Sequence, residues 1–449
     1  MNVVRRKEAL LLLVGDIAVL FVSLFLTLTL RYGSIPTQEV LLDHIVPFSI
    51  LFTLSILISF IAGLYEKHTL ILKDKLPITL TKVQIVNTLI SITFFYFIPY
   101  FIITPKITLF MYLIISLIIM VPWRMSVAQT FGRIRRNKAL LIGEGDEARE
   151  LYEEIHNNSR YGTTIVKWID TSIVKIDHTE ILTLIKSEKI HLVAADFGNK
   201  DIHNLMPTLY PFIFSGVQFA NMQKMYEEIF DRVPLSLVND SWFLENISLA
   251  SKISFDIFKR MMDIVIAIIA GLVTLIVYPF IYIAIKLDDG GPIFITQERV
   301  GKNNKMIKIK KFRTMTTNDH GNYTLVEAQE NTVTRVGLFL RKSRLDEIPQ
   351  LLNVFLGDLS LIGPRPELPS LVSVYDNTID YYSMRHIIKP GLSGWAQIYH
   401  ENHPHHGEAV TETKEKLSYD FYYIKNRSIL LDLKIALQTL KVLFSFVGR

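Results

Sequence analysis

The sequence of 449 residues contains no cysteine. Disulfide bonds, thiolate metal sites and cysteine nucleophiles are therefore excluded. Charged residues are also scarce, at 20% of the chain, whereas hydrophobic residues make up 50% and the mean hydropathy is +0.30. These values indicate an integral membrane protein with soluble parts. The net charge of +5 favours an anionic partner, either phosphates or lipid head groups, and so much apolar sequence argues against nucleic acid.

Four long apolar runs lie in the first part of the chain. Each is close to the ~20 residues that a helix needs to cross the hydrocarbon core. Lysines and arginines are concentrated before the first run, in the second loop and after the fourth run, which places both ends of the group in the cytoplasm. Residues 1–133 are therefore predicted to form a four-helix transmembrane bundle. The runs are Ala9–Leu30, Ile45–Leu64, Leu80–Ile103 and Ile107–Val127.

Residues 134–250 alternate strand-like and helical stretches, which predicts a Rossmann-like parallel α/β domain. A Gly-x-Gly-x-x-Ala turn, typical of nucleotide-binding folds, follows the first strand, so Gly143 and Gly145 are candidate nucleotide-binding residues. Asp170 ends the second strand, where such folds keep a ribose-binding acid. The alternative is that the turn is only structural. The segment has no Tyr-x-x-x-Lys pair, which an oxidoreductase or epimerase would use.

A fifth apolar run extends from Met261 to Ile285 and contains Pro279. Proline removes one hydrogen bond from a helix and kinks it. Basic residues flank both ends of the run, so both ends prefer the same face of a membrane. We therefore predict a re-entrant membrane helix over about residues 256–287, broken at Pro279.

The stretch from Lys302 to Arg313 has six basic residues and no acidic one. Its lysines alternate with isoleucines, which is typical of a strand with one charged face. One interpretation is attraction to anionic lipid. The other is phosphate binding by Lys311 and Arg313, and the two are compatible.

Residues 341–366 read RKSRLDEIPQLLNVFLGDLSLIGPRP, with the adjacent acids Asp346 and Glu347 among arginines. Apolar residues recur there at helical spacing, so a helix is predicted to begin near Ser343 and to hold both acids in its first turn. The following Gly-Pro-Arg-Pro turn fixes the direction of Arg365. Because the planar fork of arginine suits phosphate oxygens, this arrangement indicates phosphoryl chemistry.

These motifs together resemble those of the bacterial sugar transferases, which are monotopic polyprenyl-phosphate hexose-1-phosphate transferases. The resemblance covers about Ser254 to the end, and the amino-terminal half is similar to the large form of the family, whose bundle and middle domain are not thought to do the chemistry. The prediction is thus a membrane α + α/β protein with a small mixed α/β catalytic domain at 251–449. The motifs are Gly-Pro-x-Phe…Gln-x-Arg-x-Gly from Gly291, Lys311–Met315, Leu345–Gln350, Asn353-Val354, Gly357-Asp358, Leu361–Pro366 and Lys389–Gln397.

The resemblance implies that a sugar-1-phosphate moves from a UDP-sugar to undecaprenyl phosphate and that UMP is released. This is the first membrane step of capsule, exopolysaccharide or O-antigen synthesis, on the cytoplasmic side of the bacterial inner membrane. Asp346 would form a covalent aspartyl phospho-sugar, Glu347 would assist it, and both would be candidate ligands of Mg²⁺. A carboxylate is a competent nucleophile, and Mg²⁺ and arginines offset phosphate charge. The matching substrate-binding residues are Lys311, Arg313, Arg341, Arg365 and Asp420.

Several points stay open in the sequence. Tyr278 precedes Pro279 where family members often have serine. The histidines of His400–His406 could ligate zinc or belong to a loop. The alternatives to a transferase are a nucleotide-sugar oxidoreductase or epimerase that uses the middle domain, and a non-catalytic membrane scaffold. Neither the sugar nor the formation of a homo-oligomer can be read from these residues.

Overall fold

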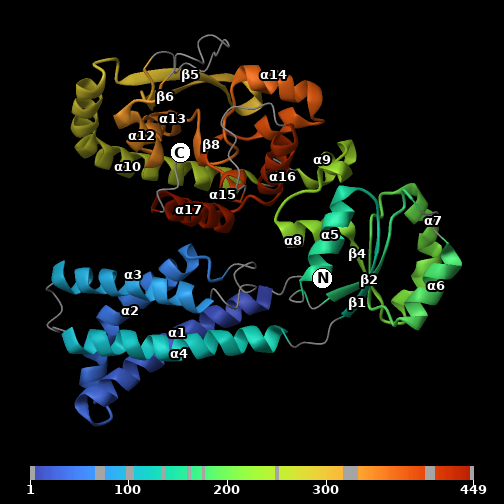
Figure 1. Cartoon of the computed structure of the whole chain (residues 1–449), viewed down its shortest axis with the longest axis horizontal. Coiled ribbons are helices and arrows are strands. Elements are labelled where there is room, and N and C mark those ends of the chain that lie inside the picture. The colour runs from blue at the N-terminus through green and yellow to red at the C-terminus, as the bar shows by residue number, and fades with distance from the viewer. Residues whose placement is uncertain are drawn as a thin grey trace. The chain divides into compact units, whose positions relative to one another are not determined.

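The chain forms two compact units, an amino-terminal unit at Met1–Phe230 and a carboxy-terminal unit at Asp231–Arg449. Figure 1 shows the elements of each unit in a computed structural model. Five helices in the described part of the chain are long and apolar enough to cross a membrane. The structure describes residues 6–65, 76–97, 106–132, 137–158, 161, 163–173, 177–247, 252–316, 332–399 and 410–444.

Four of these apolar helices are α1 (Arg6–Tyr32), α2 (Gln38–Ile61), α3 (Leu76–Phe97) and α4 (Lys106–Gly132). They pack against one another through leucines and aromatic rings, and the ring of Phe48 meets that of Tyr112 edge-on at 5.2 Å. Helices of this length and composition were predicted near the amino terminus and are confirmed. Most of the basic loop residues used to predict their orientation, at positions 67, 73, 75, 133, 135 and 136, lie outside the described residues.

A buried ion pair joins two of these helices. Asp16 of α1 pairs with Arg124 of α4, and both side chains are almost fully buried. The hydroxyl of Tyr65 donates to Asp16 at 2.7 Å, and Arg124 also donates to the carbonyl oxygen of Leu64 at 2.6 Å. Charges inside an apolar bundle need such partners, because an unpaired buried charge is strongly destabilising.

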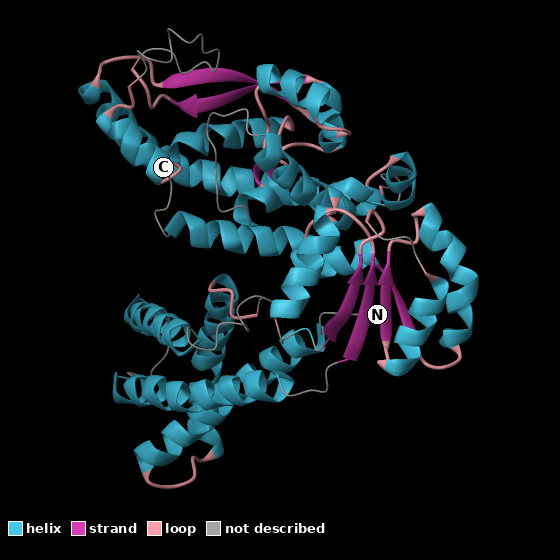
Figure 2. Cartoon of the chain, turned by 45° about the vertical axis from the view of Figure 1, so that its right-hand side comes forward, coloured by secondary structure: helices cyan, strands magenta, loops and turns pink. Residues whose placement is uncertain are grey.

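The second part of the amino-terminal unit is a parallel α/β layer structure, as predicted. Its four strands lie in the order β2-β1-β3-β4, and every pair is parallel. Figure 1 shows α6 and α7 on one face of this sheet and α5 and α8 on the other, and Figure 2 shows the strands side by side. The elements are β1 (Asn137–Ile142), α5 (Asp146–Asn157), β2 (Thr163–Ile169), α6 (His178–Ser187), β3 (Leu192–Ala195), α7 (Lys200–Leu209), β4 (Gln218–Asn221) and α8 (Met222–Phe230).

The local structure of the turn after β1 accounts for both of its glycines. Gly145 has a φ of 90°, which disfavours other residues. A Cβ atom on Gly143 would lie 2.6 Å from the sulfur of Met222. The first turn of α5 carries Asp146 and Glu147, so negative charge already lies where a pyrophosphate would bind. Nucleotide binding by Gly143 and Gly145 stays a prediction.

The carboxy-terminal unit holds two small sheets, the antiparallel pair β5–β6 and the parallel pair β7–β8. Its helices surround a core that includes the buried Trp395. The elements up to residue 356 are α9 (Asp240–Asn246), α10 (Ile253–Asp288), β5 (Phe294–Val300), β6 (Met306–Phe312), α12 (Arg335–Lys342), η7 (Leu345–Gln350) and α13 (Leu351–Leu356). The later elements are β7 (Ser360–Ile362), α14 (Pro369–Thr378), η8 (Tyr382–Ile387), β8 (Gly391–Ser393), α15 (Trp395–Tyr399), α16 (Val410–Asn426) and α17 (Ile429–Phe444).

The segment 231–247 contributes to the core of this unit. Val233, Trp242 and Phe243 are buried in the same cluster as Trp395. The indole nitrogen of Trp395 also donates to the carbonyl oxygen of Asp231 at 2.8 Å. The compact unit thus begins twenty residues before 251, the start expected for the catalytic domain, and the expected division into three domains stays a prediction.

Helix α10 runs through Pro279 without interruption for 36 residues, and Figure 1 shows that it bends. Ala267 packs in a cluster with Ile309 of β6, whereas Ile281 packs with Phe312, three residues later on the same strand. Three strand residues span about 10 Å, but the fourteen helical residues from Ala267 to Ile281 would span about 21 Å if straight. The bend therefore lets both halves of α10 pack on one small domain.

Candidate active site

The paired acids lie in the first turn of η7, a six-residue 3₁₀ helix. The sequence predicted a helix starting near Ser343, and the helix that holds both acids begins two residues later. Helix α12 ends just before Ser343, and Arg344 then adopts a left-handed conformation with a φ of 55°. Because that conformation interrupts a right-handed helix, η7 begins at Leu345. Both acids still lie at a helical amino end, as the sequence predicted.

Glu347 is held by two basic side chains. Arg365 donates a hydrogen bond of 2.7 Å to its Oε1 atom, and the Nζ atom of Lys311 lies 3.9 Å from the same oxygen. Burial would raise the pKa of Glu347, but the charges of Arg365 and Lys311 outweigh burial and lower that pKa. Glu347 is therefore ionised and fixed in orientation at neutral pH.

Asp346 differs from its neighbour in having no partner. Among the described residues, no hydrogen bond and no ion pair reaches its half-buried carboxylate. Burial, and then the charge of Glu347, raise the pKa of Asp346 to about 6, although Lys311, Arg365 and Arg341 act in the opposite direction. Two adjacent carboxylates with opposite pKa shifts are a common signature of divided catalytic roles.

The basic side chains form one group around this pair. Burial lowers the pKa of Lys311, and Arg365 and Arg299 lower it further, against the opposing charges of the two acids. Arg299 donates to the side chain of Gln297 at 2.9 Å. Arg299 is the arginine of the Gln-x-Arg-x-Gly motif and was not among the substrate-binding residues predicted from the sequence. The structure thus brings together Lys311, Arg365 and the two acids, with Arg341 close enough to affect the pKa of Asp346.

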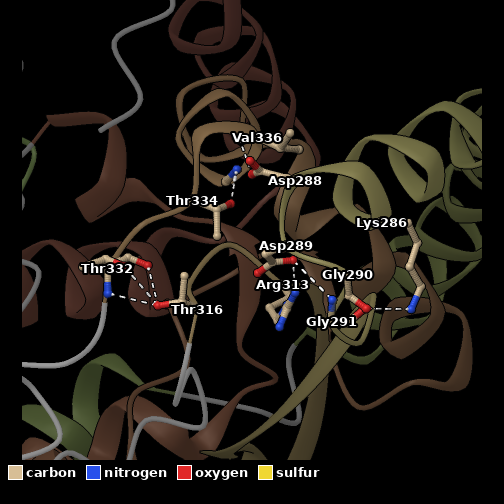
Figure 3. Close-up of polar contacts among 11 residues, drawn as sticks. Lys286, Asp288, Asp289, Gly290, Gly291, Arg313, Thr316, Thr332, Thr334 and Val336 are labelled. Atoms are coloured by element: carbon tan, nitrogen blue, oxygen red, sulfur yellow. Dashed lines mark hydrogen bonds and ion pairs between the residues drawn. The ribbon is translucent and has the colours of Figure 1, made fainter.

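Arg313, another predicted phosphate-binding residue, lies in a different polar cluster (Figure 3). Its buried guanidinium is ion-paired with Asp289, which follows the end of α10. A Cβ atom on Gly291 would overlap that guanidinium, which explains the glycine there. In the same cluster, the backbone N–H of Val336 donates to Asp288 at 2.9 Å. Arg313 therefore ties the end of β6 to the residue after α10, and Asp288 ties α10 to α12. A role of Arg313 in substrate binding stays a prediction.

Asp420 lies behind Arg365 and not beside the paired acids. Its carboxylate is 2.7 Å from the guanidinium of Arg385, and these side chains are 2% and 5% exposed. Arg385 in turn donates to the carbonyl oxygen of Arg365 at 3.1 Å and to the hydroxyl of Tyr382 at 2.6 Å. Burial raises the pKa of Asp420 to about 6 against the charge of Arg385. In this arrangement Asp420 holds Arg385, which contacts the backbone of Arg365. Direct substrate binding by Asp420 stays a prediction.

An apolar cavity of about 380 Å³ opens next to these acids. Glu347 and Arg344 form part of its wall, so it is continuous with the candidate active site. Most of the wall is apolar and comes from α10 and α17, including Phe258, Met262 and Leu433. These three side chains are 41%, 36% and 48% exposed, so the cavity is open at the surface.

The described residues contain no group of three or more histidine, cysteine, aspartate or glutamate side chains that could hold a metal ion. Asp346 and Glu347 alone could supply two carboxylates. Magnesium is commonly bound by one or two carboxylates that are completed by substrate phosphates and water. The unpartnered carboxylate of Asp346 fits such a site. The histidines of the predicted zinc alternative, His400–His406, lie outside the described residues.

Known proteins match this chain in the same carboxy-terminal segment that holds the candidate active site. The family described as "Bacterial sugar transferase" matches residues 254–446. The chain is also 38% identical over 190 residues to the "Uncharacterized sugar transferase EpsL" of Bacillus subtilis, and the match covers 42% of this chain and 89% of that protein. This chain belongs to the bacterial sugar transferase family.

Two longer relatives of this sugar transferase carry names that state a reaction. This chain is 42% identical over 192 residues to "UDP-N-acetylgalactosamine-undecaprenyl-phosphate N-acetylgalactosaminephosphotransferase" of Aeromonas hydrophila, and the match covers 42% of this chain and 44% of the relative. It is 39% identical over 190 residues to "UDP-glucose:undecaprenyl-phosphate glucose-1-phosphate transferase" of Klebsiella pneumoniae, across 41% and 39%. The match thus spans less than half the length of these two proteins.

Proposed function

We propose that this sugar transferase moves a sugar-1-phosphate from a UDP-sugar to undecaprenyl phosphate and releases UMP. The names of the two longer relatives support both substrates. The observation that carries the proposal is the unpartnered carboxylate of Asp346 beside a Glu347 that is fixed by Arg365 and Lys311. Such a site offers one nucleophile and several positive charges for a diphosphate.

In this mechanism, an ionised oxygen of Asp346 attacks the phosphorus that carries the sugar. A bond forms between that oxygen and phosphorus, the bridging P–O bond breaks, and its electron pair leaves with UMP. A phosphate oxygen of the lipid then attacks the same phosphorus and releases Asp346, which gives the lipid diphosphate sugar. Arg341 and Arg365 bind the non-bridging oxygens, and Lys311 supplies a further positive charge.

The resemblance to this family also implies Mg²⁺. The residues that would hold it are Asp346 and the oxygen of Glu347 that does not face Arg365. A bound Mg²⁺ would neutralise charge on the diphosphate oxygens of the donor. Since Glu347 is already ionised and oriented by Arg365, it can hold such a ligand position without first losing a proton.

The apolar cavity supports a polyprenyl acceptor. Its wall joins Glu347 and Arg344 to exposed apolar residues of α10, so a lipid phosphate can reach the acids while its first isoprene units stay in apolar surroundings. An ionised phosphate cannot enter hydrocarbon at tolerable cost, so the chemistry belongs at the depth of the membrane interface.

We further propose that α1–α4 form a four-helix transmembrane bundle in the bacterial inner membrane, and that α10 enters the cytoplasmic leaflet and returns. Both halves of α10 pack on the same domain, while the residues between them are exposed, including Leu272 at 61% and Ile276 at 70%. Because the chain lacks cysteine, single cysteines at Lys252 and Lys302 are unique labels. We expect both to react only with a cytoplasmic reagent. Reaction of position 302 from the periplasm would contradict the returning helix.

The transfer itself can be tested with purified full-length protein, undecaprenyl phosphate in detergent and a panel of UDP-sugars. We expect UMP release with at least one donor, and its loss in Asp346→Asn. Lys310→Gln is a matched control, because Lys310 is an exposed neighbour of Lys311 on β6. UMP release by Asp346→Asn at the rate of the unaltered protein would refute the proposal.

A further inference from the structure

A second cavity, of about 170 Å³, lies at the amino-terminal end of α10. Its lining includes none of the residues assigned above to the phosphoryl chemistry, neither the paired acids nor Lys311, Arg341 or Arg365. It is instead formed by α10, Lys302 between β5 and β6, strand β7, the two residues after η8, and the end of α16 with Arg427 after it. It shares Phe255, Lys259, Asp263 and Ile362 with the larger apolar cavity, but most of its basic side chains line it alone.

Two donors in the wall of this cavity have no partner. Ser360, which carries one of these donors on its hydroxyl, is 1% exposed, and Arg427, which carries the other at Nη2, is 8% exposed. Neither atom has a hydrogen-bond partner among the described residues. A buried polar group without a partner destabilises a fold, so most such groups bind something. Both of these donors suit an oxygen-rich ligand.

The charge of the cavity favours an anion. Five basic and two acidic side chains line it. Arg427 is paired with Asp256 at 2.9 Å, whereas Lys302 and Lys389 form no ion pair among the described residues. Burial lowers the pKa of Lys389, and the charges of Arg260 and Lys302 lower it further, against the opposing charges of Asp263 and Asp358. An anion in the cavity would relieve this repulsion between like charges.

The surroundings of the cavity indicate where the anion comes from. The first turns of α10 place Ile253, Ile257 and Met261 on the surface, at 58%, 59% and 54% exposure. Apolar side chains next to a basic pocket match the two parts of a phospholipid, whose acyl chains need apolar contact and whose phosphate needs positive charge. A soluble phosphate would need only the pocket.

We propose that this cavity binds the phosphate of an anionic membrane phospholipid and thereby fixes the amino-terminal end of α10 at the membrane surface. Ser360, Arg427, Lys302 and Lys389 would contact the phosphate oxygens. The inference does not rest on the chemistry at Asp346, only on the membrane location of α10.

The test uses the purified full-length protein in a neutral detergent and measures its unfolding temperature. Short-chain phosphatidylglycerol is added in one series, phosphatidylcholine in a second, and inorganic phosphate at matched ionic strength in a third. We expect phosphatidylglycerol to stabilise the protein at concentrations at which the other two do not, because a ligand that binds only the folded state raises its stability.

Matched variants locate the effect. In Lys302→Gln/Lys389→Gln, the concentration of phosphatidylglycerol needed for half of the stabilisation should rise by roughly tenfold or more. Lys305→Gln/Lys308→Gln removes the same charge from exposed positions outside the cavity and should leave that concentration unchanged. Ser360→Ala should weaken lipid binding while leaving the lipid-free protein at least as stable, because it removes an unpartnered hydroxyl.

Three results would overturn the proposal. Equal weakening in the two double variants would mean diffuse attraction to the surface. Stabilisation by inorganic phosphate as strong as that by phosphatidylglycerol would assign the cavity to a soluble anion. A Ser360→Ala protein that binds the lipid normally would show that the ligand does not enter the cavity.

Discussion

Arg365 donates a 2.7 Å hydrogen bond to Glu347, whereas the adjacent Asp346 has no hydrogen bond or ion pair among the described residues. The two acids are adjacent in sequence but differ in freedom and in the direction of their pKa shifts. Glu347 is held and ionised, and its negative charge helps to raise the pKa of Asp346. A free carboxylate next to a fixed one is the arrangement that a nucleophile and its supporting acid require.

This difference predicts opposite effects of two isosteric substitutions on stability. The pKa of Asp346 is raised to about 6 in the folded protein. The fold therefore loses stability as the pH rises from the ordinary pKa of an aspartate to about 6, and this loss remains at higher pH. At pH 7.5, Asp346→Asn should therefore raise the free energy of unfolding by about 1 kcal/mol or more. Denaturant unfolding of the full-length protein at this pH measures the change in the free energy of unfolding.

Glu347→Gln should have the reverse effect. The pKa of Glu347 is lowered in the fold, so its charge contributes stability above its ordinary pKa, and this stability is lost only as the pH falls through the lowered value. Removing that charge at pH 7.5 weakens the contact to Arg365 and should cost about 1.5–3 kcal/mol. Equal effects of the two substitutions would contradict the assignment of a free and a fixed acid.

The same pKa shift predicts the pH dependence of the reaction. If Asp346 must be ionised to attack, the rate of UMP release should rise with pH through about 6 and then level off. Lys311→Met removes a positive charge that lowers this pKa, so the rise should move to higher pH. Lys310→Met, a substitution at the exposed neighbouring position, should leave the pH of this rise unchanged. A profile that Lys311→Met does not shift would argue that another group controls the rate.

The packing of residues 231–247 predicts where the carboxy-terminal unit can be cut. A chain that begins at Asp231 keeps Val233, Trp242 and Phe243 in the core, whereas one that begins at Lys252 loses them. Burial of a large aromatic side chain contributes about 3–5 kcal/mol. We expect cooperative thermal unfolding only from the fragment that begins at Asp231. Two equally stable fragments would show that the earlier segment is dispensable.

The sequence predicted the features that depend on local pattern. Hydrophobic runs gave the long apolar helices, strand and helix alternation gave the parallel sheet, and spacing placed Asp346 and Glu347 in the first turn of a helix. The exact start of η7 was missed because the left-handed conformation of Arg344 is not encoded by periodicity.

Features that depend on pairing across the fold were not predicted. The ion pairs of Arg313 with Asp289 and of Arg385 with Asp420 join residues that are 24 and 35 positions apart. A charged residue in a motif predicts a charge but not its partner, so the sequence did not show the ion pairs in which Arg313 and Asp420 are held. Asp16 likewise lies within a sequence that reads as purely apolar, and only the packing of α1 on α4 reveals its pairing with Arg124.

The most direct test of the account is mass spectrometry of the full-length protein after incubation with UDP-glucose or UDP-N-acetylgalactosamine, without a lipid acceptor. We predict a phospho-sugar on the peptide that contains Asp346, its absence in Asp346→Asn, and its discharge when undecaprenyl phosphate is added. A phospho-sugar on any other residue, or UMP release by an Asp346→Asn protein that forms no adduct, would contradict Asp346 as the nucleophile.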